Sequence, residues 1–585
     1  MKKFLSKYWL WALTFLGVAV WLFWGVGYPH ALAYHEQFQL FLFDGDYFAE
    51  RVAVPGGLAR WVAELLVQFY NNAFLGATVL ALLFMLIYML SIRITGFKML
   101  GLVPVFLLWF VMGDENVMLT YAVALLMALA VCWGVRSLLS HRWALLGVAV
   151  LGMPLLYWLI GPMALLVALY VTLVLSLKAP YRLFTVGVGL LALLLVTGSA
   201  AVSSHLVPYP QDRLFIGLDY YRVPQVLPAM FVVIPVAVVL LAIVSAVWKT
   251  KIPTIVQAVS LAVVLALGVW LVPRGFDAKK YELIAYDYLV RTGQWQAVIN
   301  KAEQQQPDLP MSVSATNLAL AMENQLGERA FHFYQRGTQG LVPLFERNFS
   351  TTMLTGEIYF RLGMVNTAQR FAFEAMEALP NYNKSVRAVK RLAETNLING
   401  QYEVAQKYLQ LLEKTFFYRK WARQVMTLLD DESKIDAHPL YGDLRRKRLV
   451  EDFLFSDRET DRMCGQLFLH NPQNKVAMQY LLMWPLLNRD IPTFMSYVQV
   501  VQQRVQYYPR HIQEAICYAF AQQQQKPPQQ LVNEIISQQF LQFANAFNHG
   551  GRQNPSQIQP FKNTVWYYLV APGLNDNENK NEQAK

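Results

Sequence analysis

The most informative absence in this sequence is that of charge from its apolar stretches. Nine such stretches lie within residues 1–272, and none contains Asp, Glu, Lys, Arg or His. Pumps and coupled transporters usually place ionisable side chains at membrane depth, so this absence argues against a transporter. The sequence also lacks a Walker A loop, a G-x-G-x-x-G motif and an H-E-x-x-H motif, which are the usual signals for nucleotide binding and zinc proteolysis.

Each apolar stretch has close to the roughly 20 residues that a helix needs to cross a bilayer. The run at 143–177 is interrupted by Gly161-Pro162 and is either two short spans or one kinked helix; we count two. The sequence therefore predicts a polytopic helix bundle of about nine spans in a domain covering residues 1–272. The predicted spans are 8–27, 73–92, 99–113, 117–135, 143–160, 162–177, 183–203, 228–248 and 254–272.

Lys and Arg are distributed unevenly between alternate connections of these spans. Eleven lie on the side of the N-terminus and four on the other side, although the connections on that other side are longer. The positive-inside rule then places the N-terminus in the cytoplasm of an inner or cytoplasmic membrane. Nine spans bring residues 273–585 out on the extracytoplasmic side.

The C-terminal half is short of features that would suggest nucleic-acid binding or a disulfide framework. Its 35 basic and 30 acidic residues nearly balance and form no basic stripe, so no nucleic-acid partner is expected. The chain has three cysteines, and only Cys464 and Cys517 fall in this half. They either pair in an oxidising compartment or remain buried thiols, and the sequence does not decide between these alternatives.

The longest predicted outer connection, residues 28–72, is more than a simple anchor needs. After Pro55-Gly56-Gly57, apolar residues recur at the spacing of one helical face, while Arg60, Glu64 and Gln68 lie on another face. This pattern predicts an amphipathic helix at the membrane interface. The apolar positions are Leu58, Trp61, Val62, Leu65, Leu66 and Phe69.

Asp44-Gly45-Asp46 in this connection is the candidate for chemistry. Two carboxylates on a Gly-containing turn could bind a divalent cation, or one of them could act as a general base. The alternative is a polar turn with Asp solvated or capping a helix. Arg213 and Arg222, in the third outer connection, are candidates for binding an anionic lipid-linked substrate.

The C-terminal half has the spacing of helical repeats. Within 349–382, Gly356, Tyr359, Gly363, Ala368, Ala375 and Pro380 match the small, aromatic and terminating positions of the tetratricopeptide unit. Similar positions recur around Gly400 and, in degenerate form, around Gly293. The pattern predicts a short α-solenoid over 273–435, with a non-repeating bundle as the alternative. Further helices are predicted over 436–573, and a polar disordered tail over 574–585.

Two resemblances follow from this layout. Over roughly the first 115 residues, with the acidic positions Asp44 and Asp46 early in a long outer loop, the chain resembles integral-membrane glycosyltransferases of the C-type fold. That resemblance implies a catalytic acidic residue at Asp44 or Asp46 and a lipid-linked donor. Taken whole, the sequence resembles an uncharacterised family of bacterial multi-span proteins with a C-terminal repeat region, which implies no activity.

The predicted fold is thus all-α: a membrane bundle followed by an external, tetratricopeptide-like solenoid. The expected function is a cell-envelope scaffold that binds a protein or an envelope polymer through its repeats. The alternative is a glycosyltransferase acting on the outer face. No cofactor is expected, apart from a divalent cation if the chain is an enzyme.

Overall fold

The computed structural model describes residues 8–37, 39–138, 140–216, 229–248, 254–346, 348–379, 383–450, 459–551 and 555–570. All regular elements in these ranges are helices, which confirms the all-α prediction. Two compact units divide the chain. The membrane unit comprises Met1–Tyr281, Leu379–Arg387 and Gln410–Arg423, and the helical unit comprises Glu282–Ala378, Ala388–Leu409 and Gln424–Lys585. The unit boundary at 281/282 lies near the predicted 272/273, whereas the two short additions to the membrane unit were not foreseen.

Apolar helices make up most of the membrane unit. Its elements are α2 (Tyr8–Leu22), η1 (Phe23–Gly27), α3 (Pro29–Gln37), α4 (Gly45–Val52), α5 (Gly57–Val67), η2 (Gln68–Asn71), α6 (Ala73–Thr95), η3 (Leu100–Leu102), α7 (Val103–Val111), α8 (Leu119–Val135), η4 (Arg136–Leu138), α9 (Arg142–Gly147), η5 (Val148–Gly152), α10 (Met153–Ile160), η6 (Gly161–Met163), α11 (Ala164–Leu169), η7 (Tyr170–Leu175), α12 (Ser176–Lys178), α13 (Arg182–Ser203), α14 (Gln211–Ile216), α15 (Ala229–Val247), α16 (Thr254–Leu271) and η8 (Val272–Gly275). Helix α17 (Ala278–Arg291) contains the unit boundary.

Local signals explain where these helices begin and end. Asn72 caps α6, because its side-chain oxygen accepts hydrogen bonds from the N–H groups of Phe74 and Leu75 at 3.0 and 3.2 Å. Gly96 ends the same helix with φ +72, a conformation that only glycine adopts at little cost. Between these two residues apolar side chains lie on every face, and Arg93 in the last turn is the only charged residue, as expected of a helix in contact with both lipid and protein.

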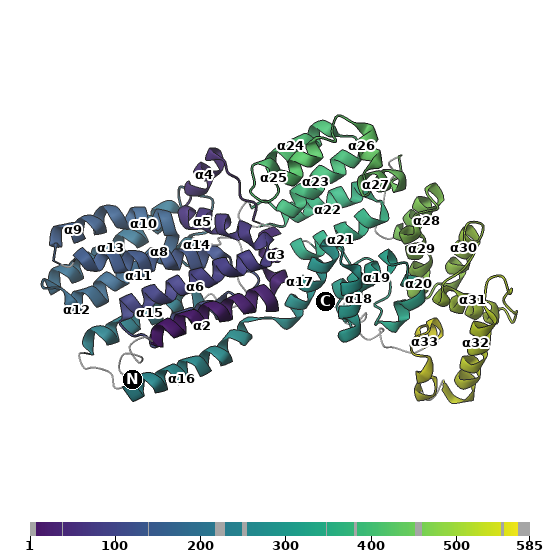
Figure 1. The fold of residues 1–585 in the computed structure, drawn as a ribbon, viewed down its shortest axis with the longest axis horizontal. Helices are drawn as coiled ribbons and strands as arrows, with labels where there is room; N and C mark the ends of the chain where they lie inside the picture. The colour runs from purple at the N-terminus through teal and green to yellow at the C-terminus, as the bar shows by residue number, and fades with distance from the viewer. Residues whose placement is uncertain are drawn as a thin grey trace. The chain divides into compact units, whose positions relative to one another are not determined.

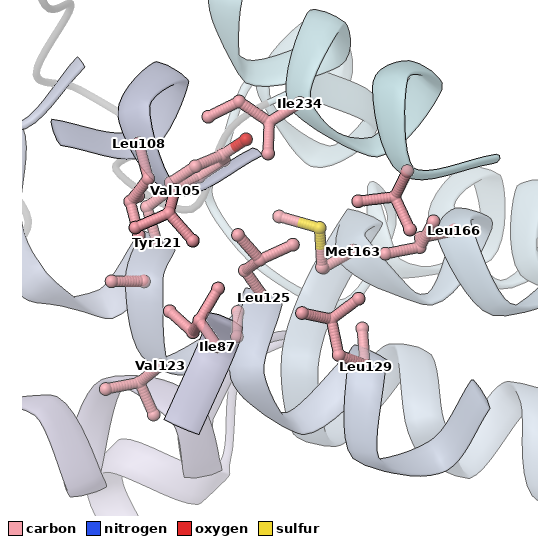
Figure 2. Close-up of a cluster of buried hydrophobic side chains, with 14 of the residues drawn as sticks. Ile87, Val105, Leu108, Tyr121, Val123, Leu125, Leu129, Met163, Leu166 and Ile234 are labelled. Carbon is pink, nitrogen blue, oxygen red and sulfur yellow. The ribbon is translucent and has the colours of Figure 1, made fainter. Parts of the chain in front are cut away.

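Side chains from α6, α7, α8, η6, α11 and α15 meet in the core of the membrane unit. Figure 2 shows them interdigitating around Leu125 and Leu129 of α8. Ile87, Val105 and Ile234 are each fully buried in this cluster. Apolar packing dominates this cluster, and one hydrogen bond, from the Tyr121 hydroxyl to the carbonyl of Phe231 at 2.8 Å, also joins α8 to α15.

The apolar run at 143–177 reverses direction. Gly161 has φ +66 and ψ −150, a backbone conformation far outside the range of a right-handed helix. The ring of Trp143 in α9 contacts that of Phe184 at the start of α13, and the hydroxyl of Tyr157 in α10 lies 3.2 Å from that of Ser203 at the end of α13. Helices α9 and α10 therefore run parallel to α13, whereas α11 and α12, which lead into α13 through a short connection, run antiparallel to it (Figure 1).

By length and composition, five helical runs in the described residues could each cross a membrane, or six if one bent helix pair is counted. The protein is therefore a membrane protein. The run Arg142–Lys178 contains two predicted spans but counts as one among these five. The predicted spans 99–113, 228–248 and 254–272 are not among the five. The count of nine therefore stays a prediction. The five runs are Trp9–Gly27, Ala73–Thr95, Leu119–Leu138, Arg142–Lys178 and Arg182–Ser203.

Short helices arranged mostly in pairs form the helical unit. After α17 its elements are α18 (Trp295–Gln304), α19 (Pro310–Met322), α20 (Leu326–Arg329), η9 (Ala330–His332), α21 (Phe349–Leu362), α22 (Val365–Glu377), α23 (Val386–Ile398), α24 (Tyr402–Glu413), α25 (Arg419–Met426), α26 (Glu432–Ala437), α27 (Tyr441–Lys447), α28 (Thr460–His470), α29 (Lys475–Leu487), α30 (Ile491–Gln502), α31 (Arg510–Gln522), α32 (Glu534–Ala546), η11 (Phe547–Gly551), η12 (Pro555–Phe561) and α33 (Val565–Val570). Helices α23, α24 and α25 each also carry residues of the membrane unit. The predicted tail, 574–585, and Pro380 lie outside the described residues.

One turn recurs six times in the described part of the helical unit. In each copy a residue with positive φ follows a helix, and the next N–H donates to the carbonyl five residues back at 2.6–2.9 Å. This is the Schellman motif, which satisfies carbonyls at a helix end. In three of the six copies Asn, Arg or Gln occupies the position with positive φ, so glycine is not strictly required there. The six residues are Gly293, Asn324, Gly363, Gly400, Arg489 and Gln524.

Small residues let α21 and α22 pack closely. Ala368 and Ala375 are fully buried, and a Cβ at Gly356 would lie 3.1 Å from that of Phe371. Two cysteines of the helical unit, Cys464 and Cys517, are buried free thiols, so the disulfide alternative is not realised in this structure. Burial raises the pKa of the Cys517 thiol to about 11, which makes it a poor nucleophile at neutral pH.

Candidate functional site

The outer segment, residues 28–72, folds into three helices because two turns are encoded locally. Asp44 caps α4 by accepting a hydrogen bond from the N–H of Asp46 at 3.1 Å. Gly56 precedes α5 with φ +77. Gly57 is needed for packing, because a Cβ there would lie 2.1 Å from the carbonyl oxygen of Arg51. These turns bring α4 and α5 side by side.

Four side chains between α4 and α5 form a buried ionic cluster: Tyr47, Arg51, Arg60 and Glu64. Glu64 is only 2% exposed. Its two carboxylate oxygens accept from Nε of Arg51 at 2.9 Å and from Nε of Arg60 at 3.0 Å. The Tyr47 hydroxyl lies 2.5 Å from Glu64 Oε2 and 2.9 Å from the carbonyl oxygen of Leu40. One buried carboxylate therefore neutralises two arginines in part and orients a tyrosine.

The electrostatics of this cluster keep Tyr47 protonated and Arg51 charged at neutral pH. Burial, and then the negative charge of Glu64, raises the pKa of Tyr47 well above its ordinary value, so the phenol stays protonated. Burial by itself would lower the pKa of Arg51, but the adjacent Glu64 carboxylate outweighs it and raises that pKa. The Glu64 carboxylate thus holds a protonated phenol and a guanidinium between α4 and α5.

The connection Leu379–Arg387 contacts the outer segment through backbone and side chains. The N–H of Leu40 donates to the carbonyl of Lys384 at 2.9 Å, and the Ser385 hydroxyl donates to the carbonyl of Gln37 at 2.7 Å. Nη1 of Arg387 donates to the side-chain oxygen of Gln37 at 3.0 Å. Nη2 of Arg60 donates to the amide oxygen of Asn383 and extends the ionic cluster into this connection.

The connection Gln410–Arg423 contacts the other end of the outer segment. Lys414 Nζ forms an ion pair with the Asp44 carboxylate, and the Lys414 carbonyl accepts from the N–H of Phe43 at 2.9 Å. The Tyr418 hydroxyl donates to the buried Glu36 at 2.8 Å. The rings of Phe416 and Phe417 pack against Phe69. Polar and aromatic contacts together attach this connection.

The connection between α7 and α8 also makes contacts within the membrane unit. Lys280 Nζ lies 2.6 Å from the Glu115 carboxylate, and the Tyr281 hydroxyl donates to the carbonyl of Gly113 at 2.9 Å. Burial, and then the charges of Glu115 and Asp114, raises the pKa of Tyr281 well above its ordinary value. The start of α17 is thereby held against the connection between α7 and α8.

In the described part of the chain, Asp44 and Asp46 share the first turn of α4, and no hydrogen bond or ion pair joins them to Arg213. Asp44 caps α4 and pairs with Lys414, whose hydrogen bond and then the Asp46 N–H lower the pKa of Asp44. Asp46 is exposed in the first turn of α4. Arg213 lies in α14 with its Nε 3.6 Å from Asp212, and Arg222 lies outside the described residues. The Lys414 ammonium lies against Asp44, where a divalent cation would bind, and no group of three His, Cys, Asp or Glu in the described ranges could hold a metal.

The prediction that α5 turns its polar face toward water is wrong. A helix lying at the membrane interface would turn Arg60, Glu64 and Gln68 toward water. These residues are buried together with Ala59 and Ala63, while the face carrying Trp61 and Leu65 is only partly covered. Small alanines allow this face to pack closely against α8 and α10, and pairing makes burial of the charges tolerable. The i,i+4 spacing of Arg60 and Glu64 was the available signal for the pair.

Comparison with known proteins places the chain in one family. Over residues 3–571 it matches, and so belongs to, the family described as a family of unknown function, DUF6057. The match covers both units, so they occur together as one family architecture. No curated protein and no solved structure matches the chain.

Proposed function

We propose that this protein is a membrane scaffold of the cell envelope whose external helical region binds a protein or an envelope polymer. One observation carries the proposal. The polar groups of the outer segment contact the connections at 379–387 and 410–423, as in the pairs Arg60–Asn383 and Asp44–Lys414. Side chains used in this way attach parts of the chain to the membrane unit, which is the task of a scaffold's base.

The recurring turns support a tetratricopeptide-like solenoid over 273–435. Gly293, Gly363 and Gly400 each join a helix pair through the same hydrogen bonds. Repeated helix pairs stack into extended surfaces that bind partners without any catalytic group. A scaffold function of this kind therefore requires no catalytic residue.

The glycosyltransferase alternative has less support from the geometry. It requires an accessible carboxylate next to groups that bind an anionic lipid-linked donor. Asp44 is paired and capping, and only Asp46 remains exposed in the described part of this turn. Arg213 contacts Asp212 instead. We therefore rank the transferase second.

The proposal includes a topology of nine spans with the N-terminus in the cytoplasm of the inner membrane. Its support is the eleven-to-four distribution of Lys and Arg. In a background without native cysteines, Gln296→Cys, in the helical unit, should react with an impermeant thiol reagent in intact cells. Ser140→Cys, in a basic connection, should react only after lysis. The reverse pattern would refute the orientation.

Complementation separates scaffold from enzyme. A deletion strain receives Asp44→Asn, Asp46→Asn, the double variant, or a chain shortened by removal of Glu282–Ala378, which takes out the helix pairs at Gly293 and Gly363 but no segment of the membrane unit. A scaffold predicts that the Asp variants restore the phenotype, because Asn also caps helices, and that the shortened chain does not. Failure of Asp46→Asn at normal membrane abundance, with rescue by the shortened chain, would establish the enzyme instead.

A further inference from the structure

A groove in the membrane unit is not explained by the scaffold function. It lies between α2, α7 and α16 and has a volume of about 610 Å³, within the range of small-molecule sites. Helix α16 packs against α7 and η3, and α2 packs mainly against α6. Residues of α2 and α16 line two walls of the groove, and residues of α7 line its floor. The walls and floor include Phe15 and Leu16, Leu265 and Val269, and Phe106 and Trp109.

The chemistry of the groove specifies an apolar occupant. Apart from the indole nitrogens of Trp11 and Trp109, the lining side chains are hydrocarbon, and none is charged. Water needs two to four polar partners to remain in a cavity, so water does not fill this one stably. The groove lies within helices long enough to span a membrane or next to them, where lipid chains are the surrounding solvent.

The dimensions of the groove match one lipid chain in one leaflet. It extends from Trp11 to Phe23 on one wall and from Leu261 to Pro273 on the other. At ~1.5 Å per residue each wall is about 18 Å long. A leaflet contributes half of the ~30 Å hydrocarbon core, so an acyl chain is long enough to fill the groove.

One end of the groove is closed and carries a cation. Phe276 packs on Phe23 at 4.9 Å between ring centroids, and Phe23 packs on Trp109 at 5.2 Å. Beside this closure, one residue beyond the lining Pro273, the exposed Arg274 lies with its guanidinium 4.2 Å from the centroid of the Trp270 ring. An arginine at the end of a membrane helix favours an anionic lipid headgroup.

We propose that this groove binds one acyl chain of an anionic glycerophospholipid, with Arg274 contacting the phosphate of the headgroup. The hydrocarbon lining selects the chain, and the cation selects the headgroup. The site would act as a structural lipid site that keeps α16, and the start of α17 after it, in place beside α2 and α7. This inference does not depend on the scaffold function.

Photolabelling of the full-length protein tests the proposal. The protein is reconstituted in vesicles of phosphatidylcholine containing a phosphatidylglycerol with a photoactivatable acyl chain. Labelling should concentrate on peptides of α2, α7 and α16. Leu265→Trp, which fills the groove, should abolish this labelling, whereas Leu194→Trp, a 69% exposed position on α13, should leave it unchanged.

A second filling variant and a headgroup variant complete the test. Val269→Trp alters a position that is 78% exposed and should also abolish labelling without loss of folding. Arg274→Gln should lower the preference for phosphatidylglycerol over phosphatidylcholine about fivefold, the effect of one interfacial arginine. Labelling that is spread evenly over all lipid-facing helices would overturn the site. Labelling that is unchanged in both Leu265→Trp and Val269→Trp would also overturn it. A disulfide-linked dimer of Val269→Cys would show that a second copy covers the groove and would also overturn it.

Discussion

The contact between α4 and α5 buries ions, whereas the contact between α21 and α22 at Gly356 and Phe371 is apolar. The buried Glu357 of α21 pairs instead with Arg361 and with Arg391 of α23. Between α4 and α5, Glu64 and two arginines are buried as ions, each with a specific partner. Between α21 and α22, Ala368 and Ala375 are buried and have no polar group to pair. The first region brings together segments more than 300 residues apart, whereas the second joins neighbours in sequence.

This difference teaches where directional interactions are needed. A helix pair linked by a tight turn finds its register by shape alone, because its turn already restricts the geometry. Connections at 379–387 and 410–423 have no such restriction relative to residues 28–72. Charged hydrogen bonds, which tolerate few geometries, then specify which residues meet. The contrast can be tested by substitutions in each region.

The largest effect is expected for Glu64→Gln. It removes the buried negative charge that both Arg51 and Arg60 contact, which should cost about 3–5 kcal/mol of the free energy of unfolding. Denaturant unfolding of the full-length protein in detergent measures it. Glu50→Gln is the control, since Glu50 also pairs with Arg51 but its side chain is 64% exposed; its effect should stay within about 0.5 kcal/mol. Equal effects would show that burial of the cluster is unimportant.

Ala368→Leu should have the next largest effect. The added side chain overpacks the fully buried contact between α21 and α22 and should destabilise it by about 1–3 kcal/mol. Faster hydrogen exchange in peptides of these two helices is the expected readout. Arg370→Leu, on the exposed side of the same helix, should leave exchange unchanged. Unaltered exchange in Ala368→Leu would contradict close packing of the pair.

Gly400→Ala tests the recurring turn without introducing a clash. The residue has φ +76, and the nearest atom to an added Cβ is the Tyr402 hydroxyl oxygen at 3.9 Å. The left-handed conformation should therefore cost about 1–2 kcal/mol of stability. Gly465→Ala, inside α28, should be neutral or stabilising, because Ala favours a helix and the added Cβ makes an ordinary contact. A stability series in which both variants behave alike would argue against a special role for the turn.

The smallest effect is expected for Gln524→Gly, and this effect is a gain of stability. This residue has φ +56, so glycine removes about 1–2 kcal/mol of backbone strain. Glycine's greater unfolded-state entropy offsets about 0.5–1 kcal/mol of that gain. A slightly higher melting temperature should result. The adjacent Gln523→Gly, at φ −92, should lower the melting temperature instead.

Several features could be predicted because they depend on neighbours in sequence. The apolar runs predict helices at the positions where helices occur, and Gly293, Gly363 and Gly400 mark turns that the structure contains. The equivalent turns at Arg489 and Gln524 escape such reasoning, since their side chains give no sign of positive φ. The face of α5 is also misread from hydrophobicity, because Arg60 and Glu64 become buried only by pairing.

The sequence singles out the segment that contains the candidate residue Asp44, but it does not predict which residues Asp44 contacts. Asp44 lies in the outer segment that the sequence singles out, yet its partner Lys414 is 370 residues away. No pattern within either segment specifies that pairing. The same holds for Arg60 with Asn383 and for Glu36 with Tyr418.

By itself the sequence determined that the N-terminal half contains apolar helices long enough for a membrane and that the regular elements in the described part of the chain are helices, because backbone polar groups in lipid must be satisfied within each helix. Tertiary structure alone decided that the outer segment encloses a buried ionic cluster and contacts two connections of the C-terminal half. The physical reason is that a charged side chain becomes worth burying only when a distant partner arrives in the right geometry, and a linear pattern does not contain that geometry.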